Sequence, residues 1–126
     1  MWAMFSDCSQ LTNIPELDTS NVIDMQYFVR HCSNLTSIPR LDVSKVTNFS
    51  QAFEGLYSLT SIGLYGFTHS INITFTSLEH DALVAFLNQA GTAYDSSQKI
   101  IIGSAKLALL SDEEKAIATN KGWTLA

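Results

Sequence analysis

The residues best suited to chemistry in this chain are its 2 cysteines and 3 histidines. His31 directly precedes Cys32, a pair that could serve nucleophilic catalysis or zinc binding. A zinc site needs further ligands at short spacing, and none follows Cys32. His80 stands between Glu79 and Asp81, a combination suited to acid–base work or metal binding. Neighbouring residues on a helix point in different directions, so these three side chains do not converge.

Familiar catalytic motifs are also missing from the sequence. It contains no Gly-rich phosphate loop, no nucleophile elbow and no pair of Cys-x-x-Cys motifs. We therefore expect no enzymatic activity, no catalytic residues, no metal and no cofactor.

The charge balance bears on possible partners. With 7 basic and 12 acidic residues the formal charge is −5, and the basic residues are scattered, which argues against nucleic acid and anionic membranes as partners. No apolar run approaches the roughly 20 residues of a membrane span, so we expect no membrane insertion. The first residues also lack the pattern of a secretion signal, so we expect no targeting signal within the chain.

The cysteines belong to a repeat of 24 residues, and this repeat must position them. The segment CSQLTNIP at residues 8–15 recurs as CSNLTSIP at 32–39 and, altered, as LYSLTSIG at 56–63. A unit this short cannot bury its apolar side alone, so successive copies must stack around a shared core. We predict one α/β domain over residues 1–126, a solenoid of about three strand-turn-helix repeats over 1–66 followed by a divergent, repeat-like α/β cap over 67–126.

Alignment of the copies predicts the core. Five columns are apolar: Leu11, Leu35 and Leu59; Ile14, Ile38 and Ile62; Leu17, Leu41 and Tyr65; Met25, Phe49 and Ile73; Phe5, Val29 and Phe53. Leu56 replaces the cysteine of the third copy, so we favour free, buried thiols for Cys8 and Cys32. A disulfide remains open, because stacked copies lie about 4.8 Å apart. Met1 falls in the column of Met25 and Phe49, so we expect the chain to be part of a longer one.

Each copy should contain an extended segment, a turn and a short helix. Asp18 and Asp42 are predicted to accept hydrogen bonds from the following backbone N–H groups. Helical spacing of Val22, Met25, Val29 and Cys32 predicts the helix. The columns also predict charge pairs between neighbouring copies, Glu16 with Arg40 and Asp7 with His31.

After Gly63 the pattern changes. We predict a strand at residues 71–75, a helix at 77–90 with a Thr76–Glu79 capping box, a buried strand at 100–102 and a helix through Asn120 with a Ser111–Glu114 capping box. Gly122 should adopt a left-handed conformation. Because Ile101 and Leu125 are also 24 residues apart, we hypothesise that these strands continue the sheet of the repeats.

Two stretches of sequence also suggest a family. Residues 4–12, MFSDCSQLT, and 17–25, LDTSNVIDM, resemble the BspA-like leucine-rich repeats of bacterial surface proteins. The tail, residues 111–126, is similar to C-termini attached to such repeats in proteins of gut bacteria and their phages. The resemblance implies a leucine-rich-repeat fold that recognises host proteins, other cells or surfaces, outside the cell or on a phage virion.

The strand face is the surface from which we expect binding, because outward residues of successive strands form a regular platform. The predicted ligand-binding residues are Asn13, Glu16, Ser37, Arg40 and Ser61, with Leu64 beside Arg40. We expect a non-catalytic recognition or adhesion module that binds a protein or glycan on a cell surface. The alternative is a structural spacer or assembly module of a surface protein or phage tail protein. The sequence leaves the ligand and the oligomeric state open.

Overall fold

The computed structural model describes residues 2–126 and consists of two small parallel sheets and three helices. Met1, which the repeat aligns with Met25 and Phe49, lies outside the described residues. One sheet has the order β1-β2 and the other the order β3-β4-β5. The elements are β1 (Ser37–Asp42), β2 (Ser61–Tyr65), β3 (Ile71–Asn72), α1 (His80–Gln89), β4 (Lys99–Ile101), α2 (Ser104–Leu107), α3 (Asp112–Thr119) and β5 (Thr124–Leu125).

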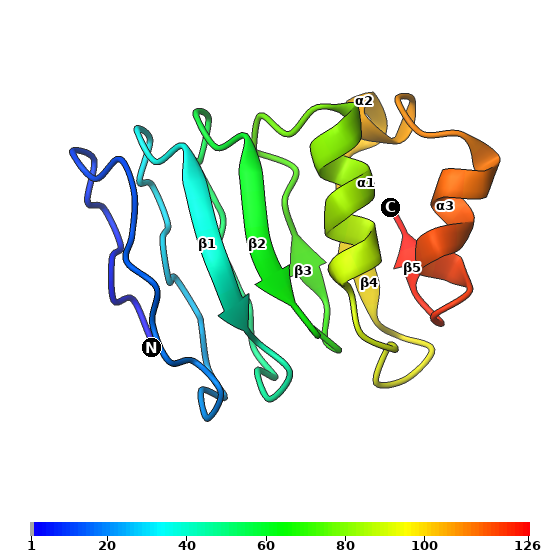
Figure 1. Ribbon diagram of the computed structural model, residues 1–126, viewed down its shortest axis with the longest axis horizontal. Helices are drawn as coiled ribbons and strands as arrows, with labels where there is room; N and C mark the ends of the chain where they lie inside the picture. The colour runs from blue at the N-terminus through cyan, green and yellow to red at the C-terminus, as the bar shows by residue number, and fades with distance from the viewer. Residues whose placement is uncertain (1) are drawn as a thin grey trace.

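The elements of one face follow each other in chain order. Figure 1 shows β1, β2, α1 and α3 in a row from the cyan to the orange part of the chain. Helix α1 contacts β2, so it occupies the place beside β2 where another strand would lie. Covering a strand edge with a helix prevents further strand pairing there.

The predicted leucine-rich-repeat solenoid of strand-turn-helix units is wrong. Within residues 2–79 the structure contains no helix, and the stretch predicted to be helical contains a β-bridge at Asp24 followed by consecutive turns over residues 26–31. Tyr27 and His31 have φ angles of 59° and 60°, in the left-handed region that an α-helix excludes. The backbone N–H of Val29 donates to the carbonyl of Ala52 at 3.1 Å, a residue of the next copy, instead of closing a helical turn.

The hypothesis that the C-terminal strands continue the sheet of the repeats is also wrong. Strand β4 pairs with β3 and β5, with Ile100 opposite Ile71 on one side and Leu125 on the other. Neither β1 nor β2 belongs to this sheet. The spacing of Ile101 and Leu125 therefore reflected a pairing among the C-terminal strands themselves, displaced by one residue from the predicted column.

Local contacts nevertheless follow the 24-residue spacing. Ser37 pairs with Ser61 and Ile38 with Ile62 in the parallel register of β1 and β2. The Thr60 hydroxyl donates to the carbonyl of Thr36, at a separation of 24 residues. The 24-residue spacing therefore determines which residues contact each other, although it did not predict the secondary structure of the segments that contain them.

The predicted core columns are largely confirmed. Ile14, Ile38 and Ile62 are all buried, as are Met25, Phe49 and Ile73. The buried side chains of both sheets and of α1 form one continuous cluster. Four column members are only partly buried: Phe5, Leu11, Leu17 and Tyr65.

The C-terminal helices differ from prediction at their starts. Helix α1 begins at His80 rather than at residue 77, because the Thr76 hydroxyl donates to the Ile73 carbonyl at 2.7 Å and forms no capping box. The Ser111–Glu114 capping box of α3 is confirmed, and Gly122 has the predicted left-handed backbone, with φ 88°. Strand β3 is shorter than predicted, and α2 was not predicted at all.

Candidate functional site

The outward side of the β1-β2 sheet contains three of the five predicted ligand-binding residues. Ser37 and Ser61 are direct partners in the parallel register, and Arg40 is exposed on β1. We use the name β1–β2 face for the outward side chains of Ser37, Arg40, Ser61 and Tyr65.

An irregularity in β1 changes the predicted neighbours of Arg40. The register shifts between Ile38 and Leu41, so Leu41 and not Arg40 pairs with Leu64. Leu64 is therefore fully buried, which corrects its predicted place beside Arg40 on the outer face. The guanidinium carbon of Arg40 lies 4.1 Å from the centre of the Tyr65 ring, a cation–π contact.

Asn13 and Glu16 lie beside this face but are not joined to it by side-chain bonds. Both are exposed in the segment before β1, which is attached by the Thr36 N–H donating to the Thr12 carbonyl at 3.2 Å. Among residues 2–126, no ion pair joins Glu16 to Arg40, so that predicted pair is wrong. The Arg40 guanidinium instead lies over the ring of Tyr65.

Gln89 contacts the edge of β2 that does not pair with β1. With its amide oriented to satisfy both groups, the side-chain nitrogen lies 2.7 Å from the carbonyl oxygen of Leu64 and 2.8 Å from that of Ile62. The backbone carbonyl of Gln89 also accepts from the N–H of Gly66 at 2.8 Å. The end of α1 thereby provides hydrogen-bond partners for backbone groups of Ile62, Leu64 and Gly66.

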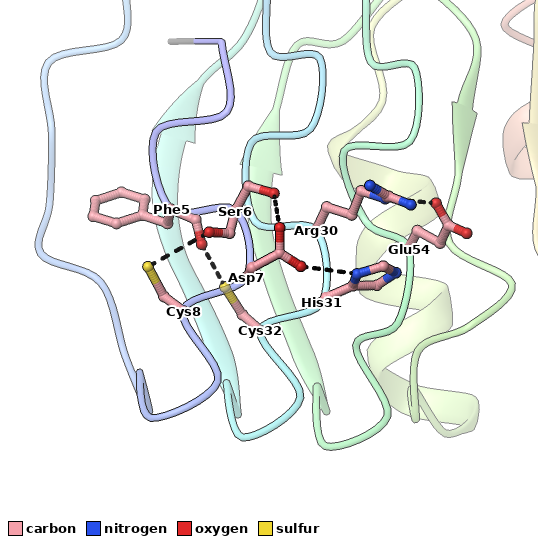
Figure 2. A network of polar contacts seen from close by, with 8 residues as sticks. All are labelled: Phe5, Ser6, Asp7, Cys8, Arg30, His31, Cys32 and Glu54. Carbon is pink, nitrogen blue, oxygen red and sulfur yellow. Dashed lines mark hydrogen bonds and ion pairs between the residues drawn. The ribbon is translucent and has the colours of Figure 1, made fainter.

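The turn segments carry a network of polar contacts, which Figure 2 shows. The predicted Asp7–His31 pair is confirmed, with Oδ1 and Nδ1 at 3.0 Å. Hydrogen bonds from His31 and then from Ser6 lower the pKa of the Asp7 carboxyl. Arg30 Nε donates to Glu54 Oε2 at 3.0 Å, a pair that the same columns contained and that the sequence reasoning missed. These pairs link successive copies through their turns.

Both cysteines are free thiols, as we favoured. Cys32 is buried, and its Sγ lies 2.8 Å from the Phe5 carbonyl oxygen. Burial raises the pKa of the Cys32 thiol. Cys8 is exposed, which corrects its predicted burial.

The predicted turns at Asp18 and Asp42 are confirmed. Asp18 Oδ1 accepts from the Ser20 N–H at 3.1 Å, and Asp42 Oδ1 accepts from the Ser44 N–H at 3.0 Å. In each case hydrogen bonds from the serine side chain and backbone lower the pKa of the carboxyl. These carboxylates stabilise turns through their Oδ1 atoms.

His80 joins two helices, and its contact with Asp81 corrects the expectation that these neighbouring side chains do not converge. Its Nδ1 lies 2.9 Å from Asp81 Oδ1 and its Nε2 lies 2.7 Å from Glu114 Oε2. Hydrogen bonds to Asp81 and then to Glu114 raise the pKa of the imidazole. In the part of the chain that the structure describes, no cluster of three His, Cys, Asp or Glu side chains could hold a metal ion.

Comparison with protein-family models finds a match for this chain. A family model described as "Mycoplasma protein of unknown function, DUF285" matches residues 1–98. The chain belongs to this family. Membership in DUF285 loosely fits the expected likeness to bacterial surface proteins, but it supports neither the leucine-rich-repeat class nor the phage-tail likeness of the C-terminus.

Comparison with curated proteins and with solved structures found no match to the chain. None of the helices in residues 2–126 is long and apolar enough to cross a membrane.

Proposed function

We propose that this DUF285 chain is a non-catalytic recognition or adhesion module that binds a protein or a glycan on a cell surface through the β1–β2 face. The observation that carries this proposal is the contact of Arg40 with Tyr65, with 4.1 Å from the guanidinium carbon to the ring centre. Arg and Tyr contribute more than most residues to binding at protein interfaces. Stacking on the ring also restrains a flexible guanidinium before a partner arrives, which lowers the entropy cost of binding.

The rest of the face supports the same function. Ser37 and Ser61 add hydroxyl groups in a fixed parallel register, and each hydroxyl can both donate and accept a hydrogen bond. Asn13 and Glu16 would extend the contact area along the neighbouring segment. A net charge of −5 makes nucleic acid an unsuitable partner.

We place this function outside the cell, on a bacterial surface or on a phage virion. Membership in DUF285 is compatible with a bacterial surface location. The alternative function is a structural spacer or assembly module. It is favoured by Trp2 and Met4, which are 62% and 51% exposed on the first segment and would suit packing against another protein.

Binding of the labelled chain to whole cells tests the proposal. Arg40→Ala should weaken binding, and Ser37→Ala combined with Ser61→Ala should weaken it further, with unchanged thermal unfolding. Lys99→Ala is the matched control, since it removes one positive charge from β4, in the other sheet. If Arg40→Ala and Lys99→Ala bind as well as the unmodified chain, the β1–β2 face is not the binding surface and the spacer function is preferred.

A further inference from the structure

A small pocket lies away from the β1–β2 face, between a turn segment and the end of β3. It has a volume of about 210 Å³ and is lined by Gln51, Phe53, Glu54, Asn72 and Phe75. A water molecule occupies about 30 Å³, and pockets for drug-sized ligands begin at about 300 Å³. The pocket is therefore the right size for one small ring.

The apolar part of the pocket consists of two aromatic side chains with different roles. Phe53 is 1% exposed and belongs to the hydrophobic core, so it forms a fixed floor. Phe75 is 49% exposed and presents its ring to solvent. An exposed ring beside a rigid floor can hold a flat apolar surface by stacking contacts.

The polar part is already oriented by the protein. Asn72 Oδ1 accepts from the Thr74 N–H at 2.9 Å, which fixes the amide. Glu54 Oε2 accepts from Arg30 Nε at 3.0 Å, and Arg30 in turn lies 5.5 Å from the centre of the Tyr27 ring. Side chains held by a second set of contacts keep their geometry before a ligand binds.

These contacts leave a defined set of groups for a ligand. In the described chain no protein acceptor pairs with the Asn72 amide nitrogen, and the Gln51 amide has no partner. The second carboxylate oxygen of Glu54 can accept a further bond, since each oxygen has two lone pairs. The pocket thus combines amide donors, an acceptor and an aromatic surface.

We infer that this pocket binds one neutral pyranose ring. A pyranose has an apolar C–H side that can stack on Phe75, and hydroxyl groups that can donate to Glu54 and accept from Asn72. An apolar side chain would remove water from Glu54, Gln51 and Asn72 without replacing its hydrogen bonds. An anionic sugar would be repelled by the Glu54 carboxylate. A cationic ligand would have to compete with Arg30 for the Glu54 carboxylate.

NMR titration of the labelled chain with methyl glycosides of glucose, galactose, mannose and N-acetylglucosamine tests this inference. Methyl glycosides imitate a sugar linked to a glycan, and the free reducing sugars serve as the comparison for a soluble ligand. At least one glycoside should shift the resonances of Gln51, Asn72 and Phe75 with saturation. The methyl glycoside of glucuronic acid should bind more weakly than that of glucose, because of Glu54.

Variants separate the pocket from the rest of the surface. Phe75→Ala should weaken binding by about three- to tenfold, and Asn72→Ala should also weaken it. Tyr94→Ala is the control, since Tyr94 is 71% exposed but does not line the pocket. Arg40→Ala should leave sugar binding unchanged, so failure of the proposed function and failure of this inference can be told apart.

Three outcomes would overturn the inference. In the first, no glycoside shifts the pocket resonances. In the second, phenol or indole shifts them and the glycosides do not, which would indicate a site for an apolar side chain. In the third, a sugar binds equally well to the unmodified chain and to Phe75→Ala, which would place binding elsewhere.

Discussion

His80 Nε2, at the first residue of α1, lies 2.7 Å from Glu114 Oε2 in α3. Glu114 also completes the capping box of α3, since its Oε1 accepts from the Ser111 N–H at 2.8 Å. One carboxylate therefore starts α3 and attaches it to α1. Its two oxygens serve different partners, so both contacts can exist together.

This arrangement predicts a pH window for stability. The folded-state pKa of His80 is raised above 6.5, first by Asp81 and then by Glu114, so its contribution is complete below pH 6.5 and is lost as pH rises through the raised value. The pKa of Glu114 is lowered below 4.5, mainly by the Ser111 N–H, so its contribution is lost as pH falls through that lowered value. Stability from the pair should therefore be greatest between pH 4.5 and pH 6.5, the ordinary pKa values of the two groups, where both contributions are complete.

Urea unfolding of His80→Gln across pH checks the prediction. The variant should be less stable than the unmodified chain at about pH 5.5 and should match it at high pH, where the imidazole is neutral. His69→Gln is the control, because His69 contacts Thr68 and Tyr94 and forms no ion pair within residues 2–126. A stability difference independent of pH would show that the imidazole acts through packing alone.

The sequence predicted the Ser111–Glu114 capping box but not the contact of Glu114 with His80. The Ser111–Glu114 capping box was predictable because its members are three residues apart and depend on local backbone geometry. The contact of His80 with Glu114 spans 34 residues and depends on how two helices pack, for which the sequence contained no periodic signal. The His80 side chain is 47% exposed as well as paired.

Lys121 should stabilise the end of α1. Its Nζ lies 2.8 Å from the Ala90 carbonyl oxygen and 3.1 Å from that of Asn88, which lack partners within the helix. Lys121→Met keeps the aliphatic stem and removes the donors, so we expect a loss of about 1–3 kcal/mol. Urea unfolding measures the loss, and hydrogen exchange should show faster opening of the last turn of α1. Lys115→Met, within α3, should change neither measurement.

Gly63 should tolerate no side chain. A Cβ there would lie 2.5 Å from the carbonyl carbon and oxygen of Pro39 and 2.6 Å from the backbone nitrogen of Arg40. These are backbone atoms at the register shift of β1, so they cannot move aside without disturbing the sheet. We expect Gly63→Ala to cost about 1–3 kcal/mol, measured by thermal or urea unfolding. Ser61→Ala, two residues earlier and exposed, should unfold like the unmodified chain.

The core columns predict large losses at two central positions. Leu35 is fully buried and Ile38 is 3% exposed, so replacing either with Ala removes packed methyl groups and leaves a cavity. Each variant should lose about 2–5 kcal/mol of unfolding free energy. Thr36→Ala, between them and exposed, is the control. Unchanged denaturation midpoints for Leu35→Ala and Ile38→Ala would contradict the burial of this column.

The 24-residue repeat predicted side-chain contacts better than it predicted helices and strands. Column alignment identifies side chains that share an environment, so it found the buried isoleucines and the Asp7–His31 pair. Helical spacing of Val22, Met25 and Val29 is also satisfied by consecutive turns, because both conformations bring such residues to one side. The left-handed backbone at Tyr27 and His31 distinguishes the two, and neither residue is a glycine that would have indicated it.

The predicted place of Leu64 beside Arg40 is wrong for a related reason. Strict 24-residue spacing placed Arg40 beside Leu64, whereas the register shift in β1 places Leu41 there. A shift of one residue moves a side chain to the other face of a strand. Pro39, which has no N–H to donate to a neighbouring strand, stands at this shift and was the available signal.

The two cysteines should differ in reactivity, because only the thiolate reacts and it must be accessible. Cys8 is exposed, whereas Cys32 is buried with a raised pKa. Iodoacetamide should therefore label Cys8 rapidly in the folded chain and Cys32 only at the rate of unfolding, as measured by mass spectrometry of timed samples. Cys8→Ser should remove the fast phase, and urea should make the two residues equally reactive. Rapid labelling of Cys32 in the folded Cys8→Ser variant would contradict the burial that holds its sulfur against the Phe5 carbonyl.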